Sequence, residues 1–543
     1  MRLNLLTKLS GASLQATGFR RARKPEKSVR FLHSQRRRQF LRAALVGLLA
    51  GTVAVFFQHA VFLSGLAAKL LSGFLNLTLG MFGRFGFILL TTLLAAISTW
   101  ITQKYAPEAA GSGIPHVKAV LLNLRKMRPG PVIRVKLIGG WMALLSGMSL
   151  GREGPTVQIG AAVGQWVARK LRVTKRSYPG LVAAGAGAGL AAAFNAPLAG
   201  FLFVMEELRR EMSSLTYGTA LAASVCAVIA QRWFLGQGAS FYLTDPSPVA
   251  LKLLPAVAVL GVLGGLLGVA FNRGIMGVLS WRDHIRVPRW VLGGLVGCIA
   301  GAIYQIVPEL TGTGHEFTQE LLRGSSKIPV GLGILLVFLL VRFLFTLSSY
   351  ATGVPGGIFS PILTMGALLG YAFGLATDIL FPSLGVSPPV MATLGMGAVL
   401  AGAVRSPLTG VVLIVEMTAE YRLLFALLLA AFVSYLLAEA LHDTPIYERL
   451  LNRDLLGSQP AQILEEPILF EVLVEPNSFL DQTQLRDTGF PSGVTIVSIA
   501  RGNGYLVPNS EVRLHAGDLL TVQVTVVNSV AAVRDVQQAA SAD

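Results

Sequence analysis

Residues 187–200 read GAGLAAAFNAPLAG, and residues 397–410 read GAVLAGAVRSPLTG. The two stretches align without a gap at an offset of 210 positions (397 − 187), and each continues to a glutamate nine residues after its proline, Glu206 and Glu416. Small residues also serve the close packing of membrane helices, which would explain a single coincidence. A match without gaps that ends on matching acids favours an internal repeat instead.

A second pair of stretches supports the repeat. Residues 155–164 match residues 361–370 in their Pro, Gly-Ala and Gly positions at an offset of 206 (361 − 155), which pairs Glu153 with Phe359. Two ordered matches at nearly equal offsets predict an inverted-topology repeat, in which broken helices from both halves meet at an ion site near the bilayer midplane. The positive amino-terminal ends of such helices can face an anion.

The composition is that of a membrane protein. Of the 543 residues, 53% are hydrophobic and 14% are charged, and the mean hydropathy is +0.62, which is too apolar for an ordinary soluble protein. We therefore expect an all-α polytopic membrane protein with broken helices. Apolar runs long enough to cross, or nearly cross, a ~30 Å hydrocarbon core recur around 41–72, 84–102, 217–231, 249–271, 290–307, 329–347 and 422–441.

The net charge of +18 is mostly local, so it does not indicate a nucleic-acid partner. Residues 1–38 hold eleven Lys and Arg and one acid, Glu26, which leaves about +8 for the rest of the chain (18 − 10). The positive-inside rule places this tail in the cytoplasm, where it would lie near lipid head groups. An organelle transit peptide is the alternative. We expect a multi-pass protein of the cell (inner) membrane with both termini cytoplasmic.

Beyond the last apolar run the chain becomes polar. Segments 470–474, 493–499 and 519–526 are rich in Val, Ile, Leu and Thr and are bounded by turn-forming residues, which predicts β-strands. We expect a small soluble α+β domain over 459–543. This region resembles the carboxy-terminal ligand-sensing domain of bacterial potassium-uptake regulators, the TrkA-C type. The resemblance implies a cytoplasmic regulatory domain, and the identity of its small ligand stays open.

Three segments rich in glycine and proline can expose backbone amides to an anion. They are GSGIP (111–115), GREGP (151–155) and GVPGGIFSP (353–361). Gly and Pro bend the chain ahead of a helix, and free amides at a helix amino terminus bind anions without a full positive charge. A site without Lys or Arg ligands would release a transported halide quickly. One such segment alone would be interpreted as a loop, but three in symmetric positions favour an anion site.

Glu153 lies inside the second of these segments, between two apolar stretches. A carboxylate at membrane depth is costly, and its default interpretation is a transport or proton site. Among anion-binding amides the carboxylate would compete with chloride for the same donors. Protonation would remove its charge and free the site, so this one residue can couple an anion to a proton.

The three segments resemble the signatures of the CLC family of chloride channels and transporters, and the similarity spans residues 40–450. The resemblance implies a homodimer in the lipid bilayer, with one pathway per subunit for chloride and protons. It places the gating glutamate at Glu153. It also implies chloride ligands at the hydroxyls of Ser112 and Tyr447 and at the backbone of Gly154, Ile358 and Phe359.

A second acid decides between an exchanger and a channel. Glu207 stands in the segment after Phe-Asn-Ala-Pro, where family members that exchange protons carry a proton-relaying glutamate and channels usually lack an acid. The resemblance therefore implies a proton-coupled chloride antiporter. Alternatively, Glu207 only pairs with Arg209, Arg210 or another base at the cytoplasmic edge.

Two residues depart from the exchangers used for comparison. His116 stands where an acid is frequent, and Lys118 stands where some bacterial members have glutamate. We expect His116 to be a solvated histidine at a helix start. What the two residues do to the charge and pH dependence at the inner mouth stays open.

Other function classes find little support. The sequence carries no nucleophile, nucleotide or metal-ligand motif, so neither an enzyme nor a cofactor or metal site is expected. Cys226 and Cys298 lie in apolar runs and indicate no disulfide framework. A passive chloride channel is the alternative, followed by a cation transporter or ligand sensor; nitrate in place of chloride stays open. The expected domains are a basic cytoplasmic tail (1–38), a CLC-type transmembrane transport domain (39–450, with repeats of about 40–237 and 249–441), and a TrkA-C-like regulatory domain (459–543).

Overall fold

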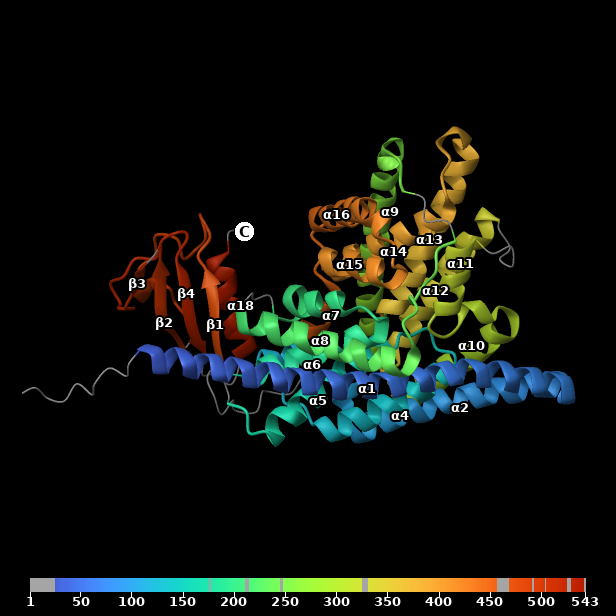
Figure 1. Ribbon diagram of the computed structural model, residues 1–543, viewed down its shortest axis with the longest axis horizontal. Coiled ribbons are helices and arrows are strands. Elements are labelled where there is room, and N and C mark those ends of the chain that lie inside the picture. Colours follow the sequence, from blue (N-terminus) through green and yellow to red (C-terminus); the bar gives the residue numbers. More distant parts are fainter. Residues whose placement is uncertain are drawn as a thin grey trace, which may run out of the picture.

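The structure, a computed structural model, describes residues 25–174, 177–209, 214–244, 248–324, 331–456, 468–490, 493–502, 504–524 and 529–541. Figure 1 shows the helices of the first half (blue to green) beside those of the second half (from the light-green α9 to orange), with the carboxy-terminal sheet as a separate lobe. Most of the expected basic tail lies outside the described residues. From Pro25 onward the chain is helical and runs without a break into the first apolar segment.

The first half contains α1 (Pro25–Leu79), α2 (Met81–Tyr105), α3 (Ile114–Leu121), α4 (Pro129–Leu145), α5 (Glu153–Lys170), α6 (Tyr178–Phe194), α7 (Pro197–Phe203), the π-helical η2 (Val204–Arg209) and α8 (Ser214–Leu235). The second half contains α9 (Leu254–His284), α10 (Arg289–Ile306), α11 (His315–Arg323), α12 (Leu332–Ala351), α13 (Phe359–Leu380), α14 (Pro388–Val404), α15 (Pro407–Thr418), α16 (Leu424–Ala440) and α17 (Ile446–Leu456). Single-turn helices connect several of them: η1 (Pro107–Ala109), η3 (Leu251–Leu253), η4 (Pro308–Leu310), η5 (Pro382–Leu384) and η6 (Tyr421–Leu423).

Among the described residues, 8 helices are long and apolar enough to cross a membrane. Seven of them correspond to the apolar runs of the sequence, and the prediction of a polytopic helical membrane protein is confirmed. The eighth, Phe359–Leu380, was not predicted, because glycines, threonines and a proline interrupt its apolar residues. Most of this helix is buried inside the protein, so helix packing determines its composition more than lipid does.

The repeat is visible in the order of the elements. The series α5, α6, α7 of the first half corresponds to α13, α14, α15 of the second, and both α6 and α14 have 17 residues. Each of these two helices ends on a residue in the left-handed conformation, Asn195 with φ 57° and Arg405 with φ 65°, two positions before a proline. Such a φ is uncommon for a residue other than glycine. The two halves therefore share one backbone break at equivalent positions.

Glycines set the contact between the paired helices in each half. A Cβ on Gly160 of α5 would lie 2.1 Å from the carbonyl oxygen of Gly185 on α6. A Cβ on Gly366 of α13 would likewise lie 2.6 Å from the carbonyl oxygen of Gly395 on α14. Since both obstacles are backbone atoms, a larger residue would push the helices apart. This is the close approach that small residues allow between membrane helices.

Glu206 and Glu416 join the two halves reciprocally. The Glu206 carboxylate accepts hydrogen bonds from the first free amides of α15, at 2.7 and 3.2 Å. The Glu416 carboxylate accepts them from the first free amides of α7, at 2.8 and 3.1 Å. Each acid satisfies orphan amides and the positive helix end of the other half. The exchange is what a two-fold relation between the halves produces.

The carboxy-terminal lobe is a four-stranded antiparallel sheet in the order β1-β4-β2-β3, covered by one helix. Its elements are β1 (Ile468–Leu473), η7 (Leu485–Asp487), β2 (Val494–Arg501), β3 (Gly504–Leu506), β4 (Leu519–Val524) and α18 (Ser529–Ala540). Ile468 pairs with Val524 in the register of β1 and β4, and α18 packs Val536 into the sheet core. The prediction of a small α+β domain is confirmed. Three strands match predicted segments, whereas the exposed β3 and the helix were not predicted.

Asp518 is buried directly before β4 and pairs with an arginine of β2. The Nη2 of Arg501 lies 2.7 Å from its Oδ2, and the backbone amide of His515 donates to the same oxygen at 2.9 Å. Burial alone would raise the pKa of Asp518. The hydrogen bonds and the charge of Arg501 outweigh it and hold the pKa of this carboxyl below its ordinary value.

We expect this lobe to lose stability in acid. A carboxyl whose pKa is lowered by folding stabilises the fold above its unfolded pKa, ~3.9 for Asp, and this stability is lost as the pH falls through the lower folded-state value. Protection factors of the β2 and β4 amides in the full chain, which are corrected for the pH dependence of intrinsic exchange, should therefore fall as the pH drops below ~3.9. Asp518→Asn should exchange faster at neutral pH and lack the additional acid step; a variant that keeps this step would contradict the assignment.

Candidate functional site

Backbone hydrogen bonds join the three glycine-rich segments, although they are far apart in the sequence. The Gly111 amide donates to Val354 O at 3.0 Å, and the Gly356 amide donates back to Gly111 O at 3.0 Å. Gly151 and Gly357 exchange two amide-to-carbonyl bonds, both of 2.7 Å. The second-half loop thus pairs with both first-half loops, and the predicted symmetric grouping is present.

Each loop leads into the amino terminus of a buried helix. α3 begins at Ile114, α5 at Glu153 and α13 at Phe359, and at none of them does the residue before the helix cap it with its own side chain. The first turn of a helix has amides without an intrahelical partner, and its dipole favours negative charge. Three such helix ends around one group of loops form a place where an anion can be bound.

Two buried hydroxyls belong to the same group. Ser112 and Tyr447 are 0% exposed, and neither hydroxyl has a hydrogen-bond partner in the part of the chain that the structure describes. Gly154 approaches closely, because a Cβ there would lie 2.7 Å from Ser112 Oγ. The Tyr447 ring stacks on Phe359 at a centroid distance of 6.0 Å. Buried hydroxyls normally form hydrogen bonds, so these two donors are suited to a bound anion.

Ile358 completes the set of residues that the sequence indicated. It is 0% exposed and immediately precedes α13, next to Phe359, which is 1% exposed. The structure therefore brings Ser112, Gly154, Phe359 and Tyr447 together by contact, with Ile358 in the adjoining peptide.

The Glu153 carboxylate lies at the amino end of α13. Ser360 donates its hydroxyl to Oε1 and its amide to Oε2, the latter at 3.4 Å, and the glutamate is fully buried. Glu153 is the first residue of α5 and Phe359 the first residue of α13, as the repeat alignment pairs them. A negative group of the protein thus occupies one of the three positive helix ends.

Lys136 was missed by the sequence reasoning. Its side chain is 0% exposed, and its Nζ donates to Gly111 O at 2.7 Å and to Ser112 O at 3.2 Å. It fixes the carbonyls of the first loop on both sides of the Gly111–Ser112 peptide. A single lysine in the apolar helix α4 was the available signal, because an ionisable residue at that depth is rarely there without a function.

Glu207 lies in η2, a π-helical turn, and its side chain is 1% exposed. Lys118 of α3 contacts Oε1 with Nζ at 2.7 Å, and Ser406 donates its hydroxyl to Oε2 at 2.9 Å. From the sequence, Arg209, Arg210 or another base at the cytoplasmic edge was the alternative partner for Glu207, and Lys118 was not among the residues named. π-Helical turns are frequent at functional sites, and this one points a carboxylate at the break of the second half.

His116 differs from the expectation of a solvated histidine. It is half-buried, and its Nδ1 lies 3.1 Å from Nε2 of Gln158 on α5. The reason is that α3 packs against both α5 and α17, which leaves its first turn only partly open to solvent.

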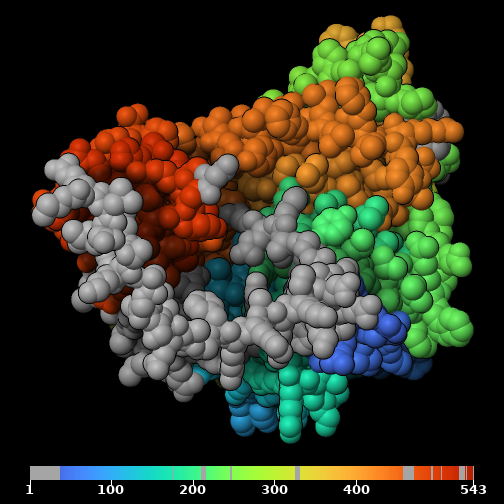
Figure 2. Space-filling model, turned by 60° about the vertical axis from the view of Figure 1, so that its left-hand side comes forward, coloured from blue at the N-terminus to red at the C-terminus, as the bar shows by residue number. Residues whose placement is uncertain are grey.

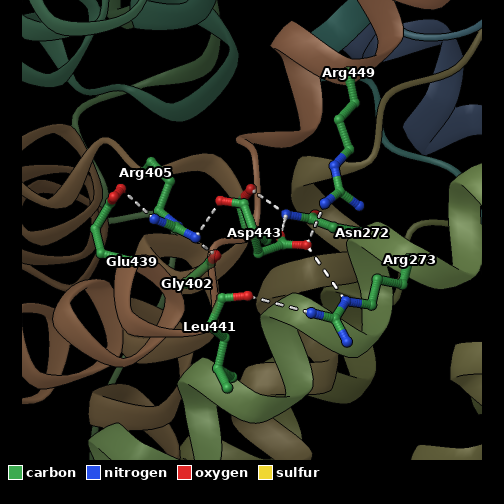
Figure 3. A network of polar contacts seen from close by, with 9 residues as sticks. Asn272, Arg273, Gly402, Arg405, Glu439, Leu441, Asp443 and Arg449 are labelled. Carbon is green, nitrogen blue, oxygen red and sulfur yellow. Dashed lines mark hydrogen bonds and ion pairs between the residues drawn. The ribbon is translucent and has the colours of Figure 1, made fainter. Parts of the chain in front are cut away.

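A polar network around Asp443 holds the helix that carries Tyr447 (Figure 3). The Asp443 side chain is fully buried, accepts Nδ2 of Asn272 at 2.8 Å, and pairs with Arg449 at 2.7 Å. Its carbonyl oxygen accepts Nη2 of Arg405 at 2.7 Å. The network ties α9, the break before α15, and α17 together, and so positions Tyr447 relative to the site.

Two cavities approach the site. One of about 430 Å³ is lined by Arg152, the neighbour of Glu153, and by His315. Another of about 800 Å³ is lined by Glu206, Arg405 and Asp443, next to the break that holds Glu207. Within the described ranges no group of three His, Cys, Asp or Glu could hold a metal ion, and Cys226 and Cys298 are free thiols.

Comparisons with known proteins agree with this geometry. The family model described as voltage gated chloride channel matches residues 94–439, and the TrkA-C domain model matches residues 469–535. The H⁺/Cl⁻ exchange transporter ClcA of Vibrio parahaemolyticus is 39% identical over 433 residues, 78% of this chain and 91% of the relative. The crystal structure of a slow cyanobacterial Cl⁻/H⁺ antiporter has a TM-score of 0.73 and 36% identity, over 78% of this chain and 99% of that one. A eukaryotic CLC transporter structure has a TM-score of 0.65 and 25% identity, over 76% and 74%. Both expected resemblances are confirmed, and this chain belongs to the CLC family of chloride channels and transporters.

Proposed function

We propose that this protein is a proton-coupled chloride antiporter. The observation that carries the proposal is the pair of buried glutamates: Glu153 sits on an anion-binding helix end, and Glu207 lies in the same half beside the second break. The H⁺/Cl⁻ exchange transporter of Vibrio parahaemolyticus and the cyanobacterial Cl⁻/H⁺ antiporter each match 78% of this chain. A channel would need only the first of the two acids.

On the chloride side, the proposed ligands are donors without a full charge. They are the hydroxyls of Ser112 and Tyr447, which lack partners among the described residues, and the backbone at Gly154, Ile358 and Phe359. Such dipoles balance binding against release, as a transport site requires. Lys136 supports these donors indirectly, because it holds the carbonyls of the loop that carries Ser112.

On the proton side, Glu153 competes with chloride. Its carboxylate takes donors at the amino end of α13, so chloride can use them only after the side chain leaves. Protonation removes the charge that holds it there. Tyr447 stacks on Phe359, whose neighbour Ser360 binds the Glu153 carboxylate, so the proposed anion site adjoins Glu153. We infer that a proton moving between Glu153 and Glu207 passes near the anion.

The proposal also covers assembly. α7 and α15 have 7 and 12 residues, fewer than the roughly 20 that span a bilayer. Half-buried Glu206 and Glu416 lie beside them, close to exposed Leu198 and Leu408. Figure 2 shows the orange surface of the α15 and α16 region adjoining the green surface around α8. Because carboxylates beside short helices would be costly against lipid, a second copy covering this face is favoured.

The protein is a multi-pass membrane protein, and we propose that it lies in the cell (inner) membrane with both termini in the cytoplasm. The basic residues before the first span support this orientation. The TrkA-C domain would then face the cytoplasm and bind a small ligand there.

The direct test is coupled transport in liposomes. Purified protein is reconstituted with a chloride gradient and no proton gradient, and proton movement is followed with a pH electrode. We expect the chloride gradient to drive protons uphill, in the direction opposite to chloride. Chloride flux without proton movement would instead establish a passive channel, and potassium flux without chloride flux would establish a cation transporter.

A further inference from the structure

Lys118 forms an ion pair with Glu207 inside the protein. The Nζ to Oε1 distance is 2.7 Å, and the two side chains are 8% and 1% exposed. The second carboxylate oxygen is held by Ser406. The neighbouring His116 on the same helix is directed to Gln158 instead. The carboxylate that the proposed function uses as a proton relay is thus fixed by a lysine from a different helix.

The other charged or titratable groups near Glu207 have contacts of their own. Arg405 is directed to Glu439 and to a backbone carbonyl, and Glu206 is directed to the amides of α15. Tyr447 interacts with Glu207 electrostatically, and Arg209 lies two residues further along η2. Among these contacts, Lys118 is the cation that touches the Glu207 carboxylate directly. Glu207 is in turn the acid that balances the charge of Lys118.

The pair has a physical consequence for a proton relay. While Glu207 is ionised, the two buried charges compensate each other. When Glu207 takes up a proton, the ammonium group of Lys118 is left buried without its counter-charge, which is costly unless it moves. Proton uptake therefore requires the ion pair to open.

Helix α3 connects this step to the anion site. It has 8 residues, with Lys118 near its carboxyl end and Ser112 two positions before its first residue. Lys136 fixes the carbonyls at the start of the same segment. Lys136 thus holds Ser112 from the end of the segment opposite to Lys118.

We propose that Lys118 is a positioning residue of the proton route, whose ion pair with Glu207 gates proton uptake from the cytoplasmic side. This inference rests on the proposed antiport function. Lys118 would set the pH range in which coupled transport operates, whereas passive chloride movement would depend on other residues.

The test compares neutral and charged replacements in liposomes at equal pH on both sides. Lys118→Gln removes the positive charge that favours ionised Glu207, so Glu207 should take up its proton at a higher pH. The pH profile of chloride-driven proton transport should therefore move about one to three pH units toward alkaline pH. Lys118→Arg retains the charge and should retain the wild-type profile. Lys118→Met serves as a second neutral variant, and the exposed Lys252→Met is the matched control.

A Glu207→Gln background separates positioning from structure. There, adding Lys118→Gln should leave the pH dependence of chloride flux unchanged, because the group through which Lys118 acts is gone. The inference would be overturned if Lys118→Gln lowered proton and chloride flux by the same factor and left the pH profile of proton transport unchanged. Lys118 would then be a structural residue. A Lys118→Arg variant that behaves like Lys118→Gln would also overturn the inference. If wild-type protein moves no protons uphill, the proposed function itself fails.

Discussion

Replacing Glu153 by alanine is expected to abolish proton transport while chloride transport continues. The carboxylate blocks the amino end of α13 through its two contacts with Ser360, and alanine frees those donors permanently. The same change removes the only proton-binding group that we assign to this end of the route. Proton flux in liposomes should fall to the level of protein-free vesicles, and chloride efflux should lose its dependence on pH.

The control is an acid that lines the cavity beside Arg152 without contacting the helix end. Glu309 is exposed and belongs to that lining, so Glu309→Ala should keep both fluxes and their coupling. Glu153→Gln, which resembles the protonated state, should behave like Glu153→Ala. A Glu153→Ala protein that still moves protons against their gradient would rule out this residue as the coupling group. One that conducts no chloride would show instead that the carboxylate supports the site.

Local sequence signals were sufficient for the architecture of the site. Glycine and proline determine the backbone conformation of their own segment. Loops such as 151–155 and 353–361 therefore indicate the start of a helix from local sequence alone. The repeat then implied that these loops meet, and Gly151 and Gly357 are in fact hydrogen-bonded to each other. Glu153 stood out because a charge between apolar stretches is rare.

Pairings between distant side chains had no such signal. Lys118 and Glu207 are 89 positions apart, and the contact depends on how α3 packs against η2. Lys136 did carry a local signal, because a lysine in an apolar helix is as unusual as the position of Glu153.

The membrane span that the sequence did not predict also reflects tertiary packing. Hydropathy detects segments whose side chains face lipid, whereas Phe359–Leu380 is buried mainly against protein. Its glycines fit the carbonyls of α14, so selection for close packing dilutes the apolar signal. Buried helices of a broken-helix transporter are therefore the ones that hydropathy detects least well.

Asp443 is expected to be the most costly polar residue to remove outside the ion route. Its fully buried side chain pairs with Arg449 at 2.7 Å and accepts Asn272 at 2.8 Å. Asp443→Ala leaves these groups without their partner, and breaking a buried pair in this way costs about 3–5 kcal/mol. Because the network positions α17, the Tyr447 hydroxyl should also be displaced. We expect a lower melting temperature in detergent and a loss of chloride flux in liposomes.

Asp283 provides the matched control, since it also pairs with two arginines but at the surface. Its side chain is 49% exposed and lies 2.8 Å from Arg282, with Arg453 as the other partner. Solvent screens such pairs, so Asp283→Ala should cost about 0–1 kcal/mol and keep chloride flux. If the two variants melt at the same temperature, burial adds nothing to the Asp443 network. If Asp443→Ala melts early but transports chloride normally, the network stabilises the fold without positioning Tyr447, and the tyrosine must be held by its stacking on Phe359 alone.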